Sequence, residues 1–318
     1  MSAVALLRPM NIGDLLDGAF TLYRKNFVTL VGIVAVATLP VLVIQLVAGL
    51  LLLPLEPLLT RPTTSSIPGF TPPEVGSLLL GGSLFLGGSL LGALASIFET
   101  GALAIFISEH YLGRQLNIQS AYAYALRRWT ALLGMSLFLF FVYAALFLVV
   151  FIPFGLLLFT MAASRSGDVL GIVAICVPCI LLPVSVLAFF VLSVRWQFAP
   201  QAIVIENRRP LDGLRRSWNL ITGSFWRVAG INLVLTILVT IISLSASFSL
   251  NFAAALVPSV ILVNVLNTLV TSALRMIVLP LQFATLTLLY YDLRVRKEGF
   301  DLQLLSEQLA ARPLMQPL

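Results

Sequence analysis

The chain has 318 residues, of which 59% are hydrophobic and 10% are charged. In a soluble domain about a quarter of the residues are charged. The composition of this chain therefore excludes a soluble domain and indicates a protein surrounded by lipid. The net charge of +6 lies in short segments between apolar runs, so we expect anionic lipid headgroups as partners and no nucleic acid. Two cysteines and one histidine exclude a disulfide framework and a four-ligand metal site, and no cofactor is expected.

The first polar segment has the periodicity of one helical face and leads into the first apolar run. Asp14 and Asp17 precede that run, and no small-residue cleavage site follows it before the next acidic loop. These features favour a retained transmembrane helix over a signal peptide. The apolar face of the segment comprises Ile12, Leu15, Leu16, Ala19, Phe20 and Tyr23.

Long apolar runs predict the membrane crossings, because a helix needs roughly 20 residues to cross a hydrocarbon core of about 30 Å. Between the first two runs, the segment Pro54 to Glu74 is rich in Pro, Thr and Ser and predicts an irregular outer loop. Five runs qualify clearly: Val28 to Leu55, Ser77 to Ile107 (interrupted by Glu99), Trp129 to Phe159, Val169 to Val194, and Val228 to Leu250.

The sixth run, Phe252 to Tyr291, is long for one crossing and contains Arg275. It holds either one long helix, kinked at Pro280, or two crossings with Arg275 in a cytoplasmic turn. The second alternative would place the basic residues after Tyr291 outside the cell, against the usual charge distribution. We therefore predict six crossings, with Phe252 to Leu269 packed as an extra or bent segment near the outer face.

Basic residues predict the orientation, because basic loops stay on the cytoplasmic side. Of the 19 Lys and Arg residues, 16 fall in every second gap, and only Arg61, Arg165 and Arg275 lie elsewhere. We expect a multi-pass protein of the bacterial cytoplasmic membrane with both termini inside. The cytoplasmic set is Arg8, Arg24, Lys25, Arg114, Arg127, Arg128, Arg195, Arg208, Arg209, Arg215, Arg216, Arg227, Arg294, Arg296, Lys297 and Arg312.

Segments similar to the first polar segment precede the third and fifth runs. Each of the three segments is followed by an aromatic residue and, five residues after that, by a glycine: Phe27/Gly32, Trp129/Gly134 and Phe225/Gly230. The fold class predicted is an all-α polytopic membrane protein. About six transmembrane helices form three hairpin repeats, each preceded by a cytoplasmic amphipathic helix at the membrane interface. We expect a single domain of residues 1–318 with repeat units of about 8–107, 115–194 and 208–293, and a cytoplasmic tail of 294–318.

Three stretches carry a resemblance to a known family: Leu7 to Phe27, Ala202 to Arg227, and Tyr290 to Asp301 with the sequence YYDLRVRKEGFD. Together they resemble the membrane domain of bacterial glycerophosphoryl diester phosphodiesterases and of stand-alone, uncharacterised relatives. In the bifunctional members of that family, the resemblance implies, hydrolysis belongs to a separate soluble barrel. This chain ends 27 residues after Tyr291, so the resemblance implies the membrane domain without that activity.

Two groups of charged residues are the candidate sites. Glu99 and Arg275 interrupt apolar runs, and an ionisable group inside a membrane needs a partner; we expect a structural pair or a solute or proton pathway. Straight helices would place Arg275 much closer to the outer face, so direct pairing would require a kink or a water-filled cavity. The second group, which either binds anionic headgroups or only fixes the topology, is Arg24, Lys25, Arg127, Arg128, Arg215 and Arg216.

Other motifs favour structural roles. Cys176-Val-Pro-Cys179 lies in an uncharged run, so we interpret both thiols as apolar filling rather than a redox pair. The glycines between Gly81 and Gly92 predict close helix packing. Beyond Tyr291, the spacing of Asp292 with Arg296, and of Arg294 with Glu298, predicts ion pairs on a continuing helix.

The sequence contains no nucleophile triad, phosphate loop or metal cluster, and we expect a non-catalytic membrane protein that organises or binds anionic lipids or partner proteins. The alternative is a transporter or lipid-translocating protein, with a pathway between repeats. A third interpretation, an intramembrane lipid enzyme, would require acidic and histidine groups to meet at the cytoplasmic side. The candidates for that site are Glu109, His110, Asp212 and Asp292.

Overall fold

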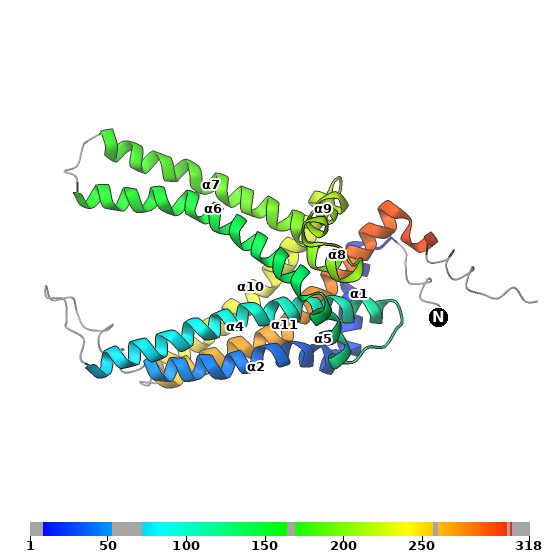
Figure 1. The fold of residues 1–318 in the computed structure, drawn as a ribbon, viewed down its shortest axis with the longest axis horizontal. Coiled ribbons are helices and arrows are strands. Elements are labelled where there is room, and N and C mark those ends of the chain that lie inside the picture. Colours follow the sequence, from blue (N-terminus) through cyan, green and yellow to red (C-terminus); the bar gives the residue numbers. More distant parts are fainter. Residues whose placement is uncertain (1–8, 53–71, 164–168, 257–259, 304–305, 307–318) are drawn as a thin grey trace, which may run out of the picture. The chain divides into compact units, whose positions relative to one another are not determined.

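The computed structural model describes residues 9–52, 72–163, 169–256, 260–303 and 306, and every regular element in that part of the chain is a helix (Figure 1). Within these ranges the side chains are also described, except those of residues 72–74, 150, 156–179, 251 and 253–262. Several predictions lie outside the described residues: the outer loop up to residue 71, the side chains of Cys176 and Cys179, and Arg8, Arg61, Arg165 and Arg312.

In the described part of the chain, six helices are long and apolar enough to cross a membrane. Each of these helices overlaps one of the predicted apolar runs. The prediction of a multi-pass membrane protein with six apolar spans is therefore confirmed. The six long helices are α2 (Phe27–Leu52), α4 (Pro72–Tyr111), α6 (Trp129–Ala163), α7 (Val169–Trp196), α10 (Phe225–Leu256) and α11 (Val260–Glu298). The shorter ones are α1 (Ile12–Lys25), α5 (Ile118–Arg127), α8 (Ala199–Ile205) and α9 (Pro210–Ile221).

The sixth span differs from the prediction. Residues up to Leu256 continue α10, and α11 runs without interruption from Val260 through Arg275 and Pro280 to Glu298. The described residues of Phe252 to Leu269 belong to the end of α10 and the start of α11, so they form no extra segment. The alternative with a turn at Arg275 is wrong, because α11 continues through this residue.

The chain divides into two compact units, which are described separately. Unit 1 comprises residues 1–127 and 231–318, and unit 2 comprises residues 128–230. In unit 1, α2 lies along α4, and α11 packs against both of them and against α1 (Figure 1). The core of this unit is apolar side chains that are fully buried, among them Leu30, Ile33, Leu103, Phe106 and Leu288.

Glycines allow the close approach of α2 and α4. A Cβ atom added at Gly88 would lie 2.8 Å from Cγ2 of Ile44, and one added at Gly81 would lie 2.7 Å from Leu52. By contrast, a Cβ at Gly82 or Gly87 would meet nothing within 4 Å. The packing role predicted for the glycine-rich stretch therefore belongs to one face of α4.

Charged groups join the two ends of the described chain in unit 1. The buried carboxylate of Asp292 accepts hydrogen bonds from the Met10 amide (2.8 Å) and from Nε of Arg296 (3.0 Å). Nη2 of Arg296 donates in turn to the Met10 carbonyl (2.8 Å). The expected ion pairs between Asp292 and Arg296 and between Arg294 and Glu298 are both present.

Unit 2 is built on the packed pair α6 and α7, with α8 and α9 at one end (Figure 1). The apolar and polar patterns of the sequence did not predict α8. The hydroxyl of Ser217 on α9 donates to the Arg195 carbonyl (2.7 Å) and accepts from the Phe198 amide (3.2 Å). This hydroxyl thereby fixes α9 to the backbone between α7 and α8.

We predict that Gly88→Val destabilises the protein, whereas Gly87→Val on the adjacent position does not. The first substitution places a branched side chain against Ile44, and overpacking of this kind costs about 1–3 kcal/mol. Thermal unfolding in detergent, followed by circular dichroism, measures the difference. Equal melting temperatures of the two variants would contradict the packing assignment.

Candidate functional site

Glu99 of α4 and Arg275 of α11 form an ion pair inside unit 1. Nη2 of Arg275 donates to Oε2 of Glu99 at 2.7 Å. The Glu99 side chain is 2% exposed and the Arg275 side chain 45%. The two ionisable groups that the sequence placed inside apolar spans are thus direct partners, as burial in a membrane requires.

Arg275 lies level with Glu99, whereas straight helices would have placed it much closer to the outer face. The hydroxyl of Tyr23 in α1 donates to the carbonyl of Ile277 at 2.9 Å, so Arg275 lies near the end of α1 rather than near the opposite end of the helices. The expectation treated Tyr291 as the membrane edge. Instead, Tyr291 is buried, and the last part of α11 packs along α1.

A cavity of about 190 Å³ lies beside the ion pair. Two buried oxygen atoms of its lining residues, Oε1 of Glu99 and Oγ1 of Thr38, have no hydrogen-bond partner. Buried polar atoms without partners are rare in native structures and indicate an unseen water or ligand. The polar side chains that line the cavity are Thr38, Gln45, Glu99, Thr271, Ser272 and Arg275.

Two further cavities adjoin this one within unit 1. A small cavity of about 30 Å³ shares Gln45 with it and is also lined by Asn264 and Thr268. A second cavity, of about 230 Å³, shares Thr271 and Arg275 with it and lies between α10 and α11. Polar side chains therefore continue on both sides of the ion pair. These polar side chains were not among the candidate residues of the sequence, because they occur singly within long apolar runs.

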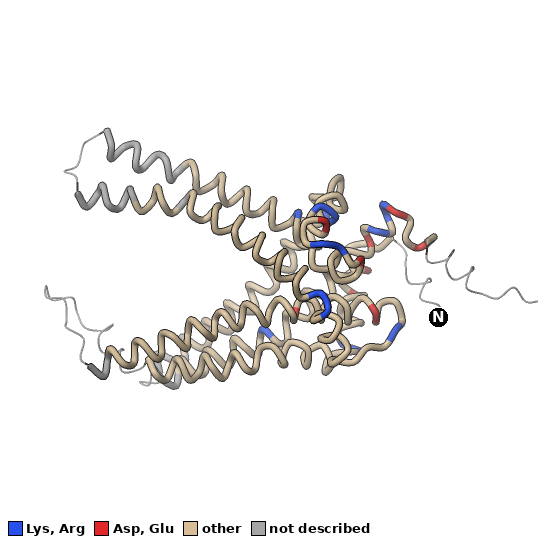
Figure 2. Tube along the Cα trace, viewed as in Figure 1, with Lys and Arg blue, Asp and Glu red and all other residues tan. Residues whose placement is uncertain are grey.

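The basic residues of the second candidate group lie at the ends of α1 and α5, between α5 and α6, and within α9. In Figure 2 the charged residues of unit 1 gather near one end of α2, α4 and α11, and those of unit 2 gather near one end of α6 and α7. Five of the six are exposed or half-buried and make no hydrogen bond or ion pair within the described residues. They are Arg24, Lys25, Arg127, Arg128 and Arg215.

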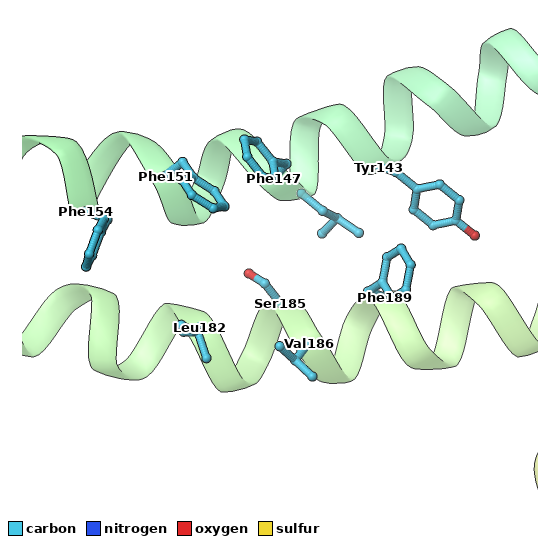
Figure 3. A pocket seen from close by; sticks show the side chains of 9 residues that line it. Tyr143, Phe147, Phe151, Phe154, Leu182, Ser185, Val186 and Phe189 are labelled. Carbon is cyan, nitrogen blue, oxygen red and sulfur yellow. The ribbon is translucent and has the colours of Figure 1, made fainter. Parts of the chain in front are cut away.

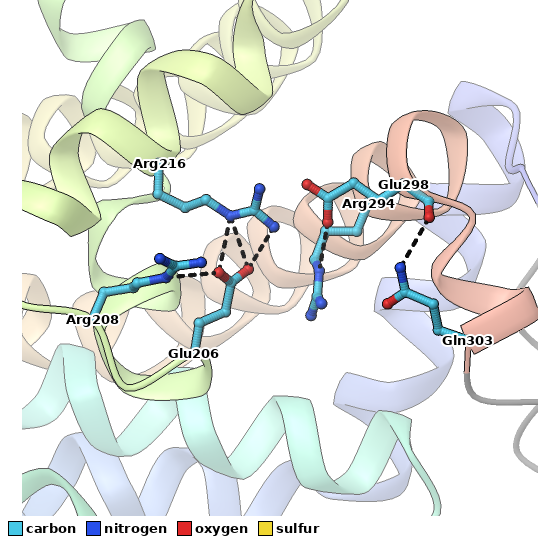
Figure 4. Close-up of polar contacts among 6 residues, drawn as sticks. All are labelled: Glu206, Arg208, Arg216, Arg294, Glu298 and Gln303. Atoms are coloured by element: carbon cyan, nitrogen blue, oxygen red, sulfur yellow. Dashed lines mark hydrogen bonds and ion pairs between the residues drawn. The ribbon is translucent and has the colours of Figure 1, made fainter. Parts of the chain in front are cut away.

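Arg216 differs from these five. Its guanidinium donates through Nε and Nη2 to both carboxylate oxygens of Glu206, at 2.9–3.1 Å (Figure 4). Arg208 contacts the same carboxylate at 3.3 Å. A bidentate contact of this kind is strong and specific in geometry, so Arg216 joins α9 to the end of α8 and leaves the candidate lipid-binding set.

Aromatic side chains accompany the basic residues of unit 2. Trp129, Trp218 and Trp226 are exposed, and the guanidinium of Arg195 lies 4.7 Å from the centre of the Trp218 ring. Exposed tryptophans at the ends of apolar helices are typical of the level of lipid headgroups.

Two buried tyrosine hydroxyls fix the short helices of unit 1. Tyr122 of α5 donates to the Ile33 carbonyl at 2.7 Å, as Tyr23 does to Ile277. Burial raises the pKa of both hydroxyls, and the negative charge of Glu99 raises that of Tyr122 further. A raised pKa favours the protonated form, so both hydroxyls remain donors at neutral pH.

Two of the residues considered for a lipid enzyme pair with arginines. Glu109 pairs with Arg114 at 3.3 Å, and Asp292 pairs with Arg296. Within the described residues, no group of three His, Cys, Asp or Glu side chains could hold a metal ion.

The chain belongs to the family of a domain of unknown function, DUF7847, which matches residues 10–293. Neither the curated proteins nor the solved structures contain a match. The resemblance to the phosphodiesterase membrane domain is not tested by these comparisons and stays a prediction.

We predict that Arg275→Met destabilises the protein, because it leaves the Glu99 carboxylate buried without its partner. Breaking a fully buried pair costs about 3–5 kcal/mol, and we expect less here because the guanidinium is half-exposed. The double variant Glu99→Gln/Arg275→Met should regain part of the loss. Unfolding by denaturing detergent gives the free energies.

Arg208→Met is the matched control for this experiment. Arg208 also pairs with a carboxylate, but its side chain is 50% exposed, and such surface pairs contribute about 0–1 kcal/mol. If Arg275→Met costs no more than Arg208→Met, the intramembrane pair does not stabilise the fold.

Proposed function

We propose that this chain is a non-catalytic, multi-pass protein of the bacterial cytoplasmic membrane that binds anionic lipid headgroups at the charged ends of its helices. The observation that carries the proposal is the set of five basic side chains that have no carboxylate partner in the described structure. Each cation near the surface of an anionic leaflet gains roughly 1 kcal/mol of attraction. Five such groups on the short helices that precede long apolar helices, or beside them, favour a lipid surface as their partner.

The same charges support the proposed orientation. Basic residues stay on the cytoplasmic side during insertion, so the charged ends of the long helices would face the cytoplasm, with both termini inside. In this arrangement α1, α5 and α9 would lie at the inner leaflet, each before a long helix, as the proposed threefold repeat requires. Apolar side chains of these helices, such as Phe20, Leu126 and Leu211, are exposed in the structure and would enter the lipid.

The resemblance to the phosphodiesterase membrane domain supports a role next to lipids without an activity of its own. The acidic side chains at the charged ends also favour a non-catalytic role, because Glu109, Glu206 and Asp292 are engaged by arginines. Carboxylates held in this way have little freedom to act as general acids or bases.

The test compares two variants with the same loss of charge. Arg127→Gln/Arg215→Gln removes two unpaired cations, whereas Arg114→Gln/Arg208→Gln removes two cations that already contact carboxylates. At roughly 1 kcal/mol for each cation, the first variant should retain about 30-fold less anionic lipid, and the second should resemble the wild type.

Native mass spectrometry of protein released from its own membranes measures the retained lipids. Selective loss of one anionic lipid class from the Arg127/Arg215 variant supports headgroup binding. If both variants and the wild type carry the same mixed lipids, the basic residues fix the topology only, and the proposed function is wrong.

A second candidate function is the passage of a solute through unit 1. The observation that favours it is the Glu99–Arg275 pair among cavities lined by polar side chains. Intramembrane ionisable residues that face a cavity mark substrate or ion pathways in many transporters.

A further inference from the structure

We infer that the cavity at the Glu99–Arg275 pair is a binding site for a small zwitterion, one that carries a primary ammonium group and a carboxylate. This inference rests on the second candidate function and names its substrate class. The evidence comes from the unsatisfied atoms of the cavity, from its size, and from its connection to the neighbouring cavities.

The unsatisfied atoms define the chemistry of the ligand. Oε1 of Glu99 is buried and has no donor, and Oγ1 of Thr38 is in the same condition. The carboxylate oxygen of Glu99 can only accept and carries negative charge, whereas the Thr38 hydroxyl can accept or donate, so a positively charged N–H donor satisfies both atoms. Arg275 gives only Nη2 to Glu99, and a guanidinium has further N–H groups that suit a carboxylate.

The charge of the site also favours a zwitterion. Glu99 and Arg275 together carry no net charge, so a ligand with a net charge would leave one charge uncompensated in a low-dielectric region. A ligand with one positive and one negative charge can pair with both Glu99 and Arg275 and adds no net charge to the site.

The volume sets the size. A cavity of about 190 Å³ accommodates a small solute such as alanine. The adjoining cavity of about 230 Å³, which shares Thr271 and Arg275 with it, leaves room for a longer chain.

The neighbouring cavities share lining residues with the central one. Along α11, Asn264 and Thr268 line the small cavity, Thr271 and Arg275 the central one, and Gln282 the cavity beside α10. From Asn264 to Arg275 the helix rises about 16 Å. Arg275 lines both larger cavities, so it stands where they meet, held there by Glu99.

The large apolar groove of unit 2 is a contrasting case. It has a volume of about 570 Å³ and lies between α6 and α7, lined by aromatic and aliphatic side chains such as Phe147, Phe151 and Phe189 (Figure 3). It offers no charged group for a polar solute, and acyl chains of the surrounding lipid suffice to fill it.

Cysteine accessibility tests the site in the full-length protein. In a Cys176→Ala/Cys179→Ala background, Thr271→Cys should react with the water-soluble reagent 2-(trimethylammonium)ethyl methanethiosulfonate. Leu269→Cys is the matched control, because Leu269 is exposed at the same depth of α11 and lines none of the described cavities. An unreactive Thr271→Cys, or equal reaction at both positions, would overturn the inference of a water-accessible cavity.

Protection then tests the ligand class. Glycine, L-alanine or β-alanine should slow the modification of Thr271→Cys, whereas N,N,N-trimethylglycine, which has no N–H donor, should not. If none of the first three protects, the zwitterion site is wrong. If trimethylglycine protects equally well, the ammonium contact with Glu99 is wrong.

Two isosteric substitutions test the contacts without a large change in packing. Glu99→Gln should raise the half-protecting concentration roughly tenfold or more, because a charge-assisted hydrogen bond is lost. Thr38→Val should raise it by a smaller factor, and Thr100→Val, whose hydroxyl bonds to Ser96 outside the cavity, should leave it unchanged. Unchanged protection in Glu99→Gln would overturn the assignment.

Uptake of the protecting amino acid into proteoliposomes is measured separately. Protection with uptake supports both binding and passage. Protection without uptake overturns the transport function and leaves the binding site in place, so the two failures are distinguishable.

Discussion

The membrane interior provides no hydrogen-bond partners, and this constraint determines most of the structure. An unsatisfied backbone group in hydrocarbon costs several kcal/mol, so the apolar runs form long, uninterrupted helices. The same constraint applies to the ionisable side chains Glu99 and Arg275, which lie in different helices and bond to each other. This pair forms only when Glu99 of α4 and Arg275 of α11 lie at the same level along the packed helices. The contacts of α2 with α4, and of α11 with α2 and α4, hold the helices at that level.

Outside the apolar spans, hydrogen bonds of side chains to backbone groups position the short helices of unit 1. Asp292 and Arg296 hold both polar groups of Met10, and Tyr23 and Tyr122 reach carbonyls of α11 and α2. These contacts set the height at which α11 passes α1. The position of Arg275 beside Glu99 therefore depends on polar groups beyond the end of the apolar run.

The sequence predicted the number of apolar spans because each run is long and nearly free of charge. It also predicted the pair of Asp292 with Arg296, since both lie on one helix at a fixed spacing. It misplaced Arg275, because the depth of a residue in α11 depends on contacts between distant segments, which no local pattern reveals. The same limit hid the difference between Gly87 and Gly88, and it hid the contact of Arg216 with Glu206 across the connection from α8 to α9.

The neutrality of the Glu99–Arg275 pair has a consequence for solute movement. Moving one net charge across a potential of 100 mV changes the free energy by about 2.3 kcal/mol, so a site with net charge would respond to the membrane potential. A neutral pair that binds a zwitterion moves no net charge, and the direction of passage would then follow the concentration of the solute. For the solute to pass from one large cavity to the other, Arg275 would have to leave the contact with Glu99. Dependence of uptake on an imposed potential would show that a net charge crosses with the solute, which the neutral pair does not provide.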